Sequence, residues 1–206
     1  MSGLLSRRGI LPALFAAALL SGCASGGGAP AARHASGGLR ESMAMLPLEN
    51  LSGRGEYGER FSRLVWSTLG RTGRWDIVDP GEVDAVLVEL RIRSAGSLTT
   101  EQVLKAAGRL KARWIVAGTL LECGLVHTPD GDMPTFGLSL RVLDGQTGRV
   151  AWTDLRARTG QDHETIFGWG REENLDRLAE TTARELIDHL QTTETPDSTS
   201  MKEGKP

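Results

Sequence analysis

The chain has 206 residues, with 24 lysines and arginines against 26 acidic residues and a formal net charge of −2. This length suits a single domain with flanking segments, and no basic stretch is dense enough to predict a nucleic-acid partner. Apolar residues make up 39% of the chain, which is enough for a hydrophobic core without disulfide staples.

The N-terminus carries the pattern of a secretory signal. Two arginines precede an apolar run over residues 10–20, and the run ends in Leu20-Ser21-Gly22-Cys23. This ending resembles the lipobox of bacterial lipoproteins, whose cysteine is acylated with diacylglycerol before the signal is removed. We therefore predict that lipid is attached to Cys23. The alternatives are an ordinary signal peptide or a short membrane anchor, although the run is too short to span a bilayer core of ~30 Å.

A lipidated Cys23 divides the chain into parts. These are a signal peptide, a flexible tether rich in Ala, Ser and Gly, a folded domain and a polar disordered tail, over residues 1–22, 23–39, 40–191 and 192–206. Cys123 then has no partner in its own chain, so we expect it to be a small buried hydrophobe. Ala24 follows Cys23 where an aspartate would resemble an inner-membrane retention signal, which favours the periplasmic face of the outer membrane.

The first half of the predicted domain begins with a strand and a helix. The short apolar run over residues 43–48 predicts a buried strand, and turn-forming residues over 49–55 predict a loop. Apolar residues then recur at helical spacing over residues 56–72, which predicts an amphipathic helix. Trp66 lies outside its apolar stripe. It either forms a partner surface or packs beneath a neighbouring element.

A second short strand is predicted over residues 75–79, and the signals of a helix start follow it. Asp79 is placed to cap the helix, Pro80 to occupy its first turn, and Glu82 to complete a capping pattern. The apolar residues that follow fit a helix, but every second residue between 86 and 92 is also apolar, as in a strand. The start signals favour the helix.

The rest of the domain predicts a further helix, an antiparallel meander and a final helix. A capping box at its start and a stripe of apolar residues predict the first helix over residues 99–111. The three strands and the last helix are predicted over residues 114–123, 136–142, 149–159 and 171–191. The first of these strands is apolar on both faces, as is typical of a central strand covered on both sides.

An irregular stretch over residues 160–170 contains Phe167-Gly168-Trp169-Gly170. Phe167 and Trp169 either insert into a partner protein or cover the edge of the sheet. Together with Trp66, they are the candidate partner-binding residues.

One glycine pattern has the outline of a dinucleotide-binding motif. Gly53, Gly55 and Gly58 show the spacing G-x-G-x-x-G between a predicted strand and a predicted helix. We reject this interpretation because residues 49–52 separate the strand from the first glycine, and Glu49 would place negative charge near the phosphates. A meander also replaces the repeated βαβ units of such folds. We expect a flexible loop here, and neither a nucleotide nor another cofactor.

No catalytic or metal-binding arrangement is apparent. The four histidines, at positions 34, 127, 163 and 189, are scattered, and no pair has metal-ligand spacing. Asp162, His163 and Glu164 are adjacent, but adjacent residues rarely converge on one substrate atom, so a solvated loop is favoured. We therefore expect the protein not to be an enzyme.

Three segments together resemble a superfamily of bacterial envelope proteins that includes CsgG, LpoB and the amino-terminal domain of TolB. MLPLENLSG is similar to its LPFENLSG opening, RLKARWIVAGTL to a helix-to-strand passage, and DGQTGRVAW to its D-x-x-T-G-x-V-x-W hairpin, at residues 45–53, 109–120 and 144–152. The resemblance implies a single α/β domain with a mixed sheet of about five strands, helices on both faces and no enzymatic activity. The expected order is strand, helix, strand, two helices, three strands and helix.

These observations predict a lipid-anchored, non-catalytic periplasmic module that binds an envelope protein. Two alternatives are a subunit of a CsgG-like secretion complex and an LpoB-like activator of peptidoglycan synthesis. A CsgG-like pore needs long hairpins, and the two predicted hairpin connections are too short to carry extra spanning strands. The short tether argues against an activator that must reach a partner at the inner membrane.

Overall fold

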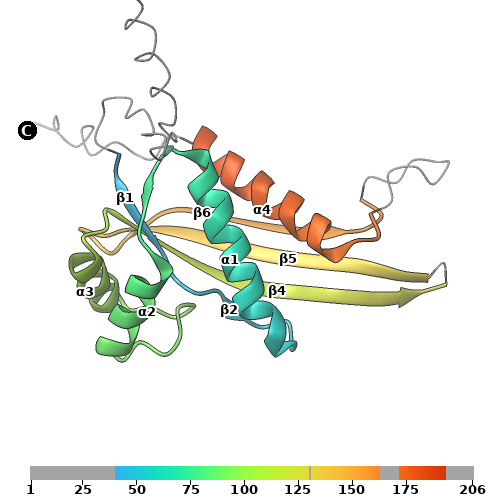
Figure 1. The fold of residues 1–206 in the computed structure, drawn as a ribbon, viewed down its shortest axis with the longest axis horizontal. Coiled ribbons are helices and arrows are strands. Elements are labelled where there is room, and N and C mark those ends of the chain that lie inside the picture. The colour runs from blue at the N-terminus through green and yellow to red at the C-terminus, as the bar shows by residue number, and fades with distance from the viewer. Residues whose placement is uncertain (1–39, 130, 163–171, 194–206) are drawn as a thin grey trace, which may run out of the picture. The chain divides into compact units, whose positions relative to one another are not determined.

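The computed structural model of the chain describes residues 40–129, 131–162 and 172–193 (Figure 1). Its elements are, in chain order, β1 (Ser42–Met45), β2 (Glu49–Asn50), α1 (Gly55–Thr72), β3 (Asp76–Ile77), α2 (Pro80–Glu89), α3 (Thr100–Leu110), β4 (Trp114–Thr128), β5 (Gly131–Asp144), β6 (Val150–Thr159) and α4 (Leu175–Thr192). The predicted α/β class and the predicted order of strands and helices are confirmed, with the short strand β2 in addition.

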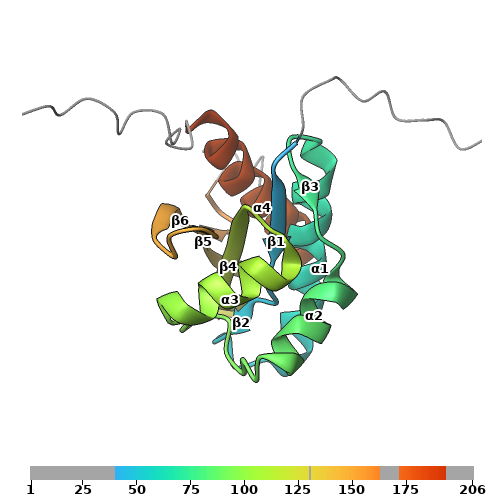
Figure 2. The ribbon, with the colours of Figure 1, turned by 90° about the vertical axis from the view of Figure 1, so that its left-hand side faces the viewer.

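The strands form one mixed sheet in the order β3-β1-β4-β5-β6, and β2 also pairs with β4. The pairs β1–β3, β1–β4 and β2–β4 are parallel, whereas β4–β5 and β5–β6 are antiparallel. The parallel part exists because helices connect its consecutive strands, and the antiparallel part is the predicted meander. Figure 2 shows β6 at the outer edge of the sheet.

Helices cover both faces of the sheet and bury two apolar clusters. Helices α1 and α4 pack on one face, where Phe61 of α1 and Phe136 of β5 meet edge to face with ring centroids 5.0 Å apart. Helices α2 and α3 pack on the other face, where Val83 contributes to the second cluster. The neighbouring β4 residues Ile115 and Val116 are both buried, one in each cluster. This confirms β4 as a central strand covered on both sides.

The local signals for helix starts are confirmed, except that Glu82 does not complete the capping pattern predicted with Asp79. The Asp79 carboxylate accepts a hydrogen bond from the Gly81 N–H at 2.8 Å, and α2 begins at Pro80. The helix interpretation of the following residues holds, since Val86 is buried whereas Val88 is 79% exposed. At the start of α3, Thr99 and Gln102 form the predicted capping box, with side-chain-to-backbone bonds of 2.9 and 3.2 Å.

Several predicted boundaries were wrong. Helix α4 begins at Leu175 and not near residue 171, because the Asn174 side chain accepts from the N–H groups of Asp176 and Arg177 and so caps the helix there. Strands β4 and β5 are also longer than predicted and pair as far as Thr128 and Gly131. The outer halves of β4 and β5 pair only with each other or with β6. Buried and exposed residues alternate less regularly there than in a central strand, so the sequence pattern did not reveal the full length of the strands.

Asp144 organises the turn between β5 and β6. Its carboxylate accepts from the N–H groups of Gln146 at 2.7 Å and Thr147 at 3.0 Å, and it pairs with the Arg113 guanidinium at 2.9 Å. Burial opposes ionisation of this carboxyl, but the two N–H donors and Arg113 outweigh it and hold its pKa below the usual range. The D-x-x-T-G pattern therefore has a structural role as a turn.

The described residues contain no helix that is both long enough and apolar enough to cross a bilayer. Cys123 is buried in the cluster beneath α1 and α4, as predicted. Its burial raises the pKa of the thiol to about 11. Cys123 is thus a packed side chain and not a reactive one.

Candidate functional site

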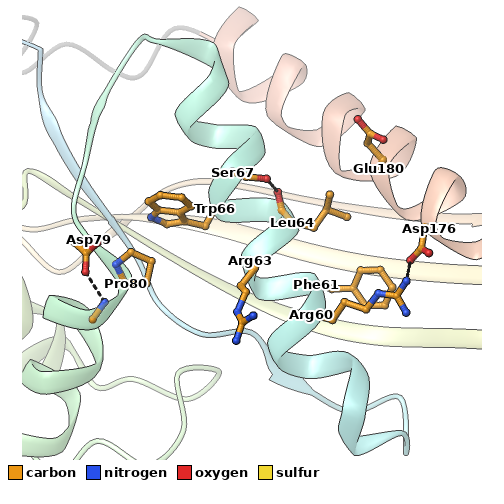
Figure 3. A pocket seen from close by; sticks show the side chains of 11 residues that line it. Arg60, Phe61, Arg63, Leu64, Trp66, Ser67, Asp79, Pro80, Asp176 and Glu180 are labelled. Carbon is orange, nitrogen blue, oxygen red and sulfur yellow. Dashed lines mark hydrogen bonds and ion pairs between the residues drawn. The ribbon is translucent and has the colours of Figure 1, made fainter. Parts of the chain in front are cut away.

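The outer face of α1 is hollowed between α4 and the start of α2 (Figure 3). The larger of two hollows has a volume of about 800 Å³ and is lined by Arg60, Leu64, Trp66 and Asp176, among others. A smaller hollow of about 270 Å³ adjoins it. Arg63, Trp66 and Pro80 line both hollows. We call the pair of hollows the Trp66 groove.

Trp66 is held in place on the wall of this groove. Its indole N–H donates a hydrogen bond to the Val78 carbonyl at 3.2 Å, and its ring packs against the apolar cluster beneath α1. Trp66 thus packs against a neighbouring element, since Val78 belongs to the turn between β3 and α2, and its predicted place in a partner surface stays a prediction. The indole is only partly buried and still lines the groove.

Charged side chains surround the apolar part of the groove. Arg60 of α1 pairs with Asp176 of α4, and their side chains are 52% and 55% exposed. Glu180 of α4 pairs with Arg184 at 2.8 Å and with Arg71 of α1 at 3.7 Å. Exposed pairs of this kind contribute about 0–1 kcal/mol each. They can therefore exchange partners at little cost when another molecule enters the groove.

The smaller hollow lies beyond the carboxyl end of β1. The chain leaves β1 toward α1 on one face of the sheet and leaves β3 toward α2 on the other face. Crevices at such a switch point are common binding sites in open α/β sheets. The prediction from sequence included Trp66 but missed Pro47, Leu48 and Pro80, which line the same hollow. These residues come together only in the folded chain.

The groove offers binding surface but no reactive pair. The Ser62 hydroxyl donates to the Gly58 carbonyl at 2.7 Å, and the Ser67 hydroxyl donates to the Leu64 carbonyl at 2.9 Å. Both hydroxyls are thus held by their own helix. The described lining residues include no histidine or cysteine that could serve as base or nucleophile. An apolar centre with a charged rim is the usual composition of a protein-binding surface.

The glycine motif encloses a side chain of the protein itself. Asn50 fills the loop between β2 and α1: its amide nitrogen donates to the Arg54 carbonyl at 2.7 Å, and its oxygen accepts from the N–H and hydroxyl of Ser52 at 3.1 and 2.7 Å. Gly58 packs against the Asn50 side chain. Gly53 has φ +75°, a conformation that favours glycine. The ENLSG segment, residues 49–53, is therefore held in place by hydrogen bonds within this loop.

The remaining candidate residues are dispersed. Cys23, Phe167 and Trp169 lie outside the described residues, so their predicted roles stay predictions. His127 and His189 each contact one carboxylate, of Asp132 at 2.9 Å and of Asp154 at 2.7 Å. In the part of the chain that the structure describes, no group of three or more His, Cys, Asp or Glu side chains is arranged to hold a metal ion.

No protein-family model matches the sequence, and no curated protein matches it. Solved structures with the same fold do match. PelC from Paraburkholderia phytofirmans, solved as a dodecamer, is 20% identical with a TM-score of 0.53, over 74% of this chain and 88% of that chain. Lipoprotein GNA1162 from Neisseria meningitidis is 12% identical with a TM-score of 0.53, over 73% and 98%. The hypothetical protein CT253 from Chlamydia trachomatis is 14% identical with a TM-score of 0.53, over 74% and 96%.

At these identities the likeness establishes the fold alone. The chain shares its fold with PelC and with lipoprotein GNA1162. The single α/β domain with a mixed sheet, which the three sequence segments implied, is thus confirmed as a fold.

Proposed function

We propose that the protein is a lipid-anchored, non-catalytic module of the bacterial cell envelope, which binds another envelope protein through the Trp66 groove. The observation that carries this proposal is the combination of Leu20-Ser21-Gly22-Cys23 with a domain that has the fold of lipoprotein GNA1162. The groove adds a surface of suitable composition. Ala24 after Cys23 supports the periplasmic face of the outer membrane as the location.

The tether would keep the domain close to its membrane. The first strand begins at Ser42, and the 16 residues from 24 to 39 reach at most ~56 Å when fully extended. As a flexible coil they would span about 20–25 Å. A partner of the groove would therefore lie in the same membrane or in the adjacent periplasm.

Metabolic labelling with palmitate tests the anchor. The full chain should take up label and sediment with membranes, whereas a Cys23→Ala variant should do neither. Label that survives this substitution would refute attachment at Cys23.

Site-specific photocrosslinking in intact cells tests the groove. A photoreactive amino acid at Ser67, which lines the groove, should capture a defined envelope protein that mass spectrometry identifies. The matched control is Val88, which is 79% exposed on α2 and lies outside both hollows. Equal capture of the same protein at both positions would exclude the groove as its binding site.

A second candidate function is that of a subunit in a ring-shaped secretion assembly. The observation that favours it is the likeness to PelC, which was solved as a dodecamer. Electron microscopy of the protein extracted in detergent separates the two functions. Rings of defined symmetry would support the second, and particles of one or two chains would support the first.

A further inference from the structure

Strand β6 forms one edge of the sheet in the part of the chain that the structure describes. Within residues 40–129, 131–162 and 172–193, β6 pairs with β5 alone, over Val150 to Thr159. The Gly160 N–H, next in line, donates to the Pro134 carbonyl at 2.9 Å, so even-numbered residues direct their backbone groups toward β5. The Leu155 N–H faces away and is bonded to the Asp154 carboxylate at 2.7 Å. The odd-numbered residues therefore direct their backbone groups away from β5, and no other strand of the described residues pairs with them.

The side chains of β6 give this edge a defined pattern. Trp152 belongs to the cluster beneath α4, and Asp154 and Arg158 contact His189 and Glu185 of α4 at 2.7 and 2.9 Å, so the even-numbered side chains lie on that face. The odd-numbered side chains lie on the opposite face, where Leu155 is 53% exposed. An exposed strand edge is a template for pairing with another strand.

We propose that β6 pairs antiparallel with β6 of a second copy of this chain, about a twofold axis at Leu155. Only registers that join odd-numbered residues match the outward backbone groups. Moving the twofold axis by one residue, to residue 154 or to residue 156, places Asp154 opposite Asp154 or Arg156 opposite Arg156. The register centred on Leu155 instead places Asp154, which pairs with Arg156 of its own chain at 3.0 Å, opposite Arg156 of the second copy as well, twice by symmetry. Opposite charges stabilise cross-strand pairs and like charges destabilise them, so the charges select this register.

The same register gives other groups a partner. Trp152 comes opposite Arg158 of the second copy, within reach of a cation–π contact. Leu155 meets Leu155 of the second copy and loses its exposure. Within the described chain, the Nε atoms of Arg156 and Arg158 are buried without an acceptor, and carboxylates from the second copy would supply acceptors next to these guanidinium groups. Each residue contacts its symmetry counterpart, as in a closed twofold interface.

A charge-swap experiment tests this pairing with the full lipidated chain in detergent micelles, with native mass spectrometry as the readout. The unmodified chain should give a mass of two copies. Asp154→Arg places two arginines opposite each other and Arg156→Asp places two aspartates opposite each other, so each variant alone should give a single copy. An equimolar mixture should form a dimer of one variant with the other, because both ion pairs are restored: one with its original sign and the other, between the two substituted residues, with reversed sign.

Three outcomes would overturn the proposal. These are an unmodified chain that stays a single copy at tens of micromolar, single variants that remain dimeric, or folded variants that do not combine when mixed. Circular dichroism establishes that each variant is folded.

Disulfide crosslinking tests the register without a change of charge. Residues 155 of the two copies would be directly opposite, with Cα atoms ~5.5 Å apart, which a disulfide can bridge. Residues 153 would be about four strand positions apart, or ~14 Å, which is too far. L155C should therefore form a reducible dimer under mild oxidation and T153C should not. Equal crosslinking of the two variants, or none by L155C, would contradict this register.

Discussion

Replacing Asn50 with alanine tests whether the ENLSG segment is structural. Its side chain makes three hydrogen bonds: two are accepted from Ser52 and one is donated to the Arg54 carbonyl. A hydrogen bond contributes about 0.5–1.5 kcal/mol net, and these bonds are partly exposed, so Asn50→Ala should lower the free energy of unfolding by ~2 kcal/mol. Loss of the contact with Gly58 adds to this effect.

Equilibrium unfolding in urea measures the change. The midpoint should fall while the slope stays constant, because the same surface is exposed on unfolding. Ser52→Ala is the graded control: it removes one of the three bonds and should cost ~1 kcal/mol. An Asn50→Ala variant within ~0.5 kcal/mol of the unmodified chain would refute the structural role. The motif would then have to be explained by a ligand.

Three further predictions concern the core, the turn and the thiol. Phe136→Ala should cost about 3–5 kcal/mol by calorimetry, because this fully buried ring packs against Phe61; a loss under ~1 kcal/mol would contradict the packing. The pKa of Asp144 is lowered, so its stabilisation is complete above the unfolded value of ~3.9 and is lost as pH falls through the folded pKa. Asp144→Asn should therefore flatten the acid limb of stability against pH, and parallel curves would refute this. With a pKa of about 11, Cys123 should react with Ellman's reagent at pH 8 only after unfolding; immediate reaction would show an open site.

Features encoded by neighbouring residues could be predicted from the sequence. The Asp79 and Thr99 caps depend on side chains that bond to backbone groups two or three residues away, and both formed as predicted. The Asp79 cap also decided in favour of helix α2 where apolar alternation allowed a strand. The antiparallel meander was predictable because each strand has apolar residues on the correct face.

Features that arise from tertiary contacts could not be predicted in this way. Strand β2 is only two residues long and exists because Glu49 and Asn50 pair with β4. Leu104 belongs to the apolar stripe of α3, yet it is 38% exposed and Ala106 is buried in its place. The face of this helix that packs on the sheet is therefore shifted relative to the stripe of apolar residues. The Trp66 groove likewise combines residues of α1, α2 and α4 whose proximity has no signal in the local sequence.

The account depends most on the lipid anchor, and one measurement addresses it directly. Intact mass spectrometry of the chain purified from its native membranes should show a protein that begins at Cys23 and carries the added mass of diacylglycerol. A chain that retains residues 1–22, or one recovered without lipid from the cytosol, would contradict the proposed place of this domain in the envelope.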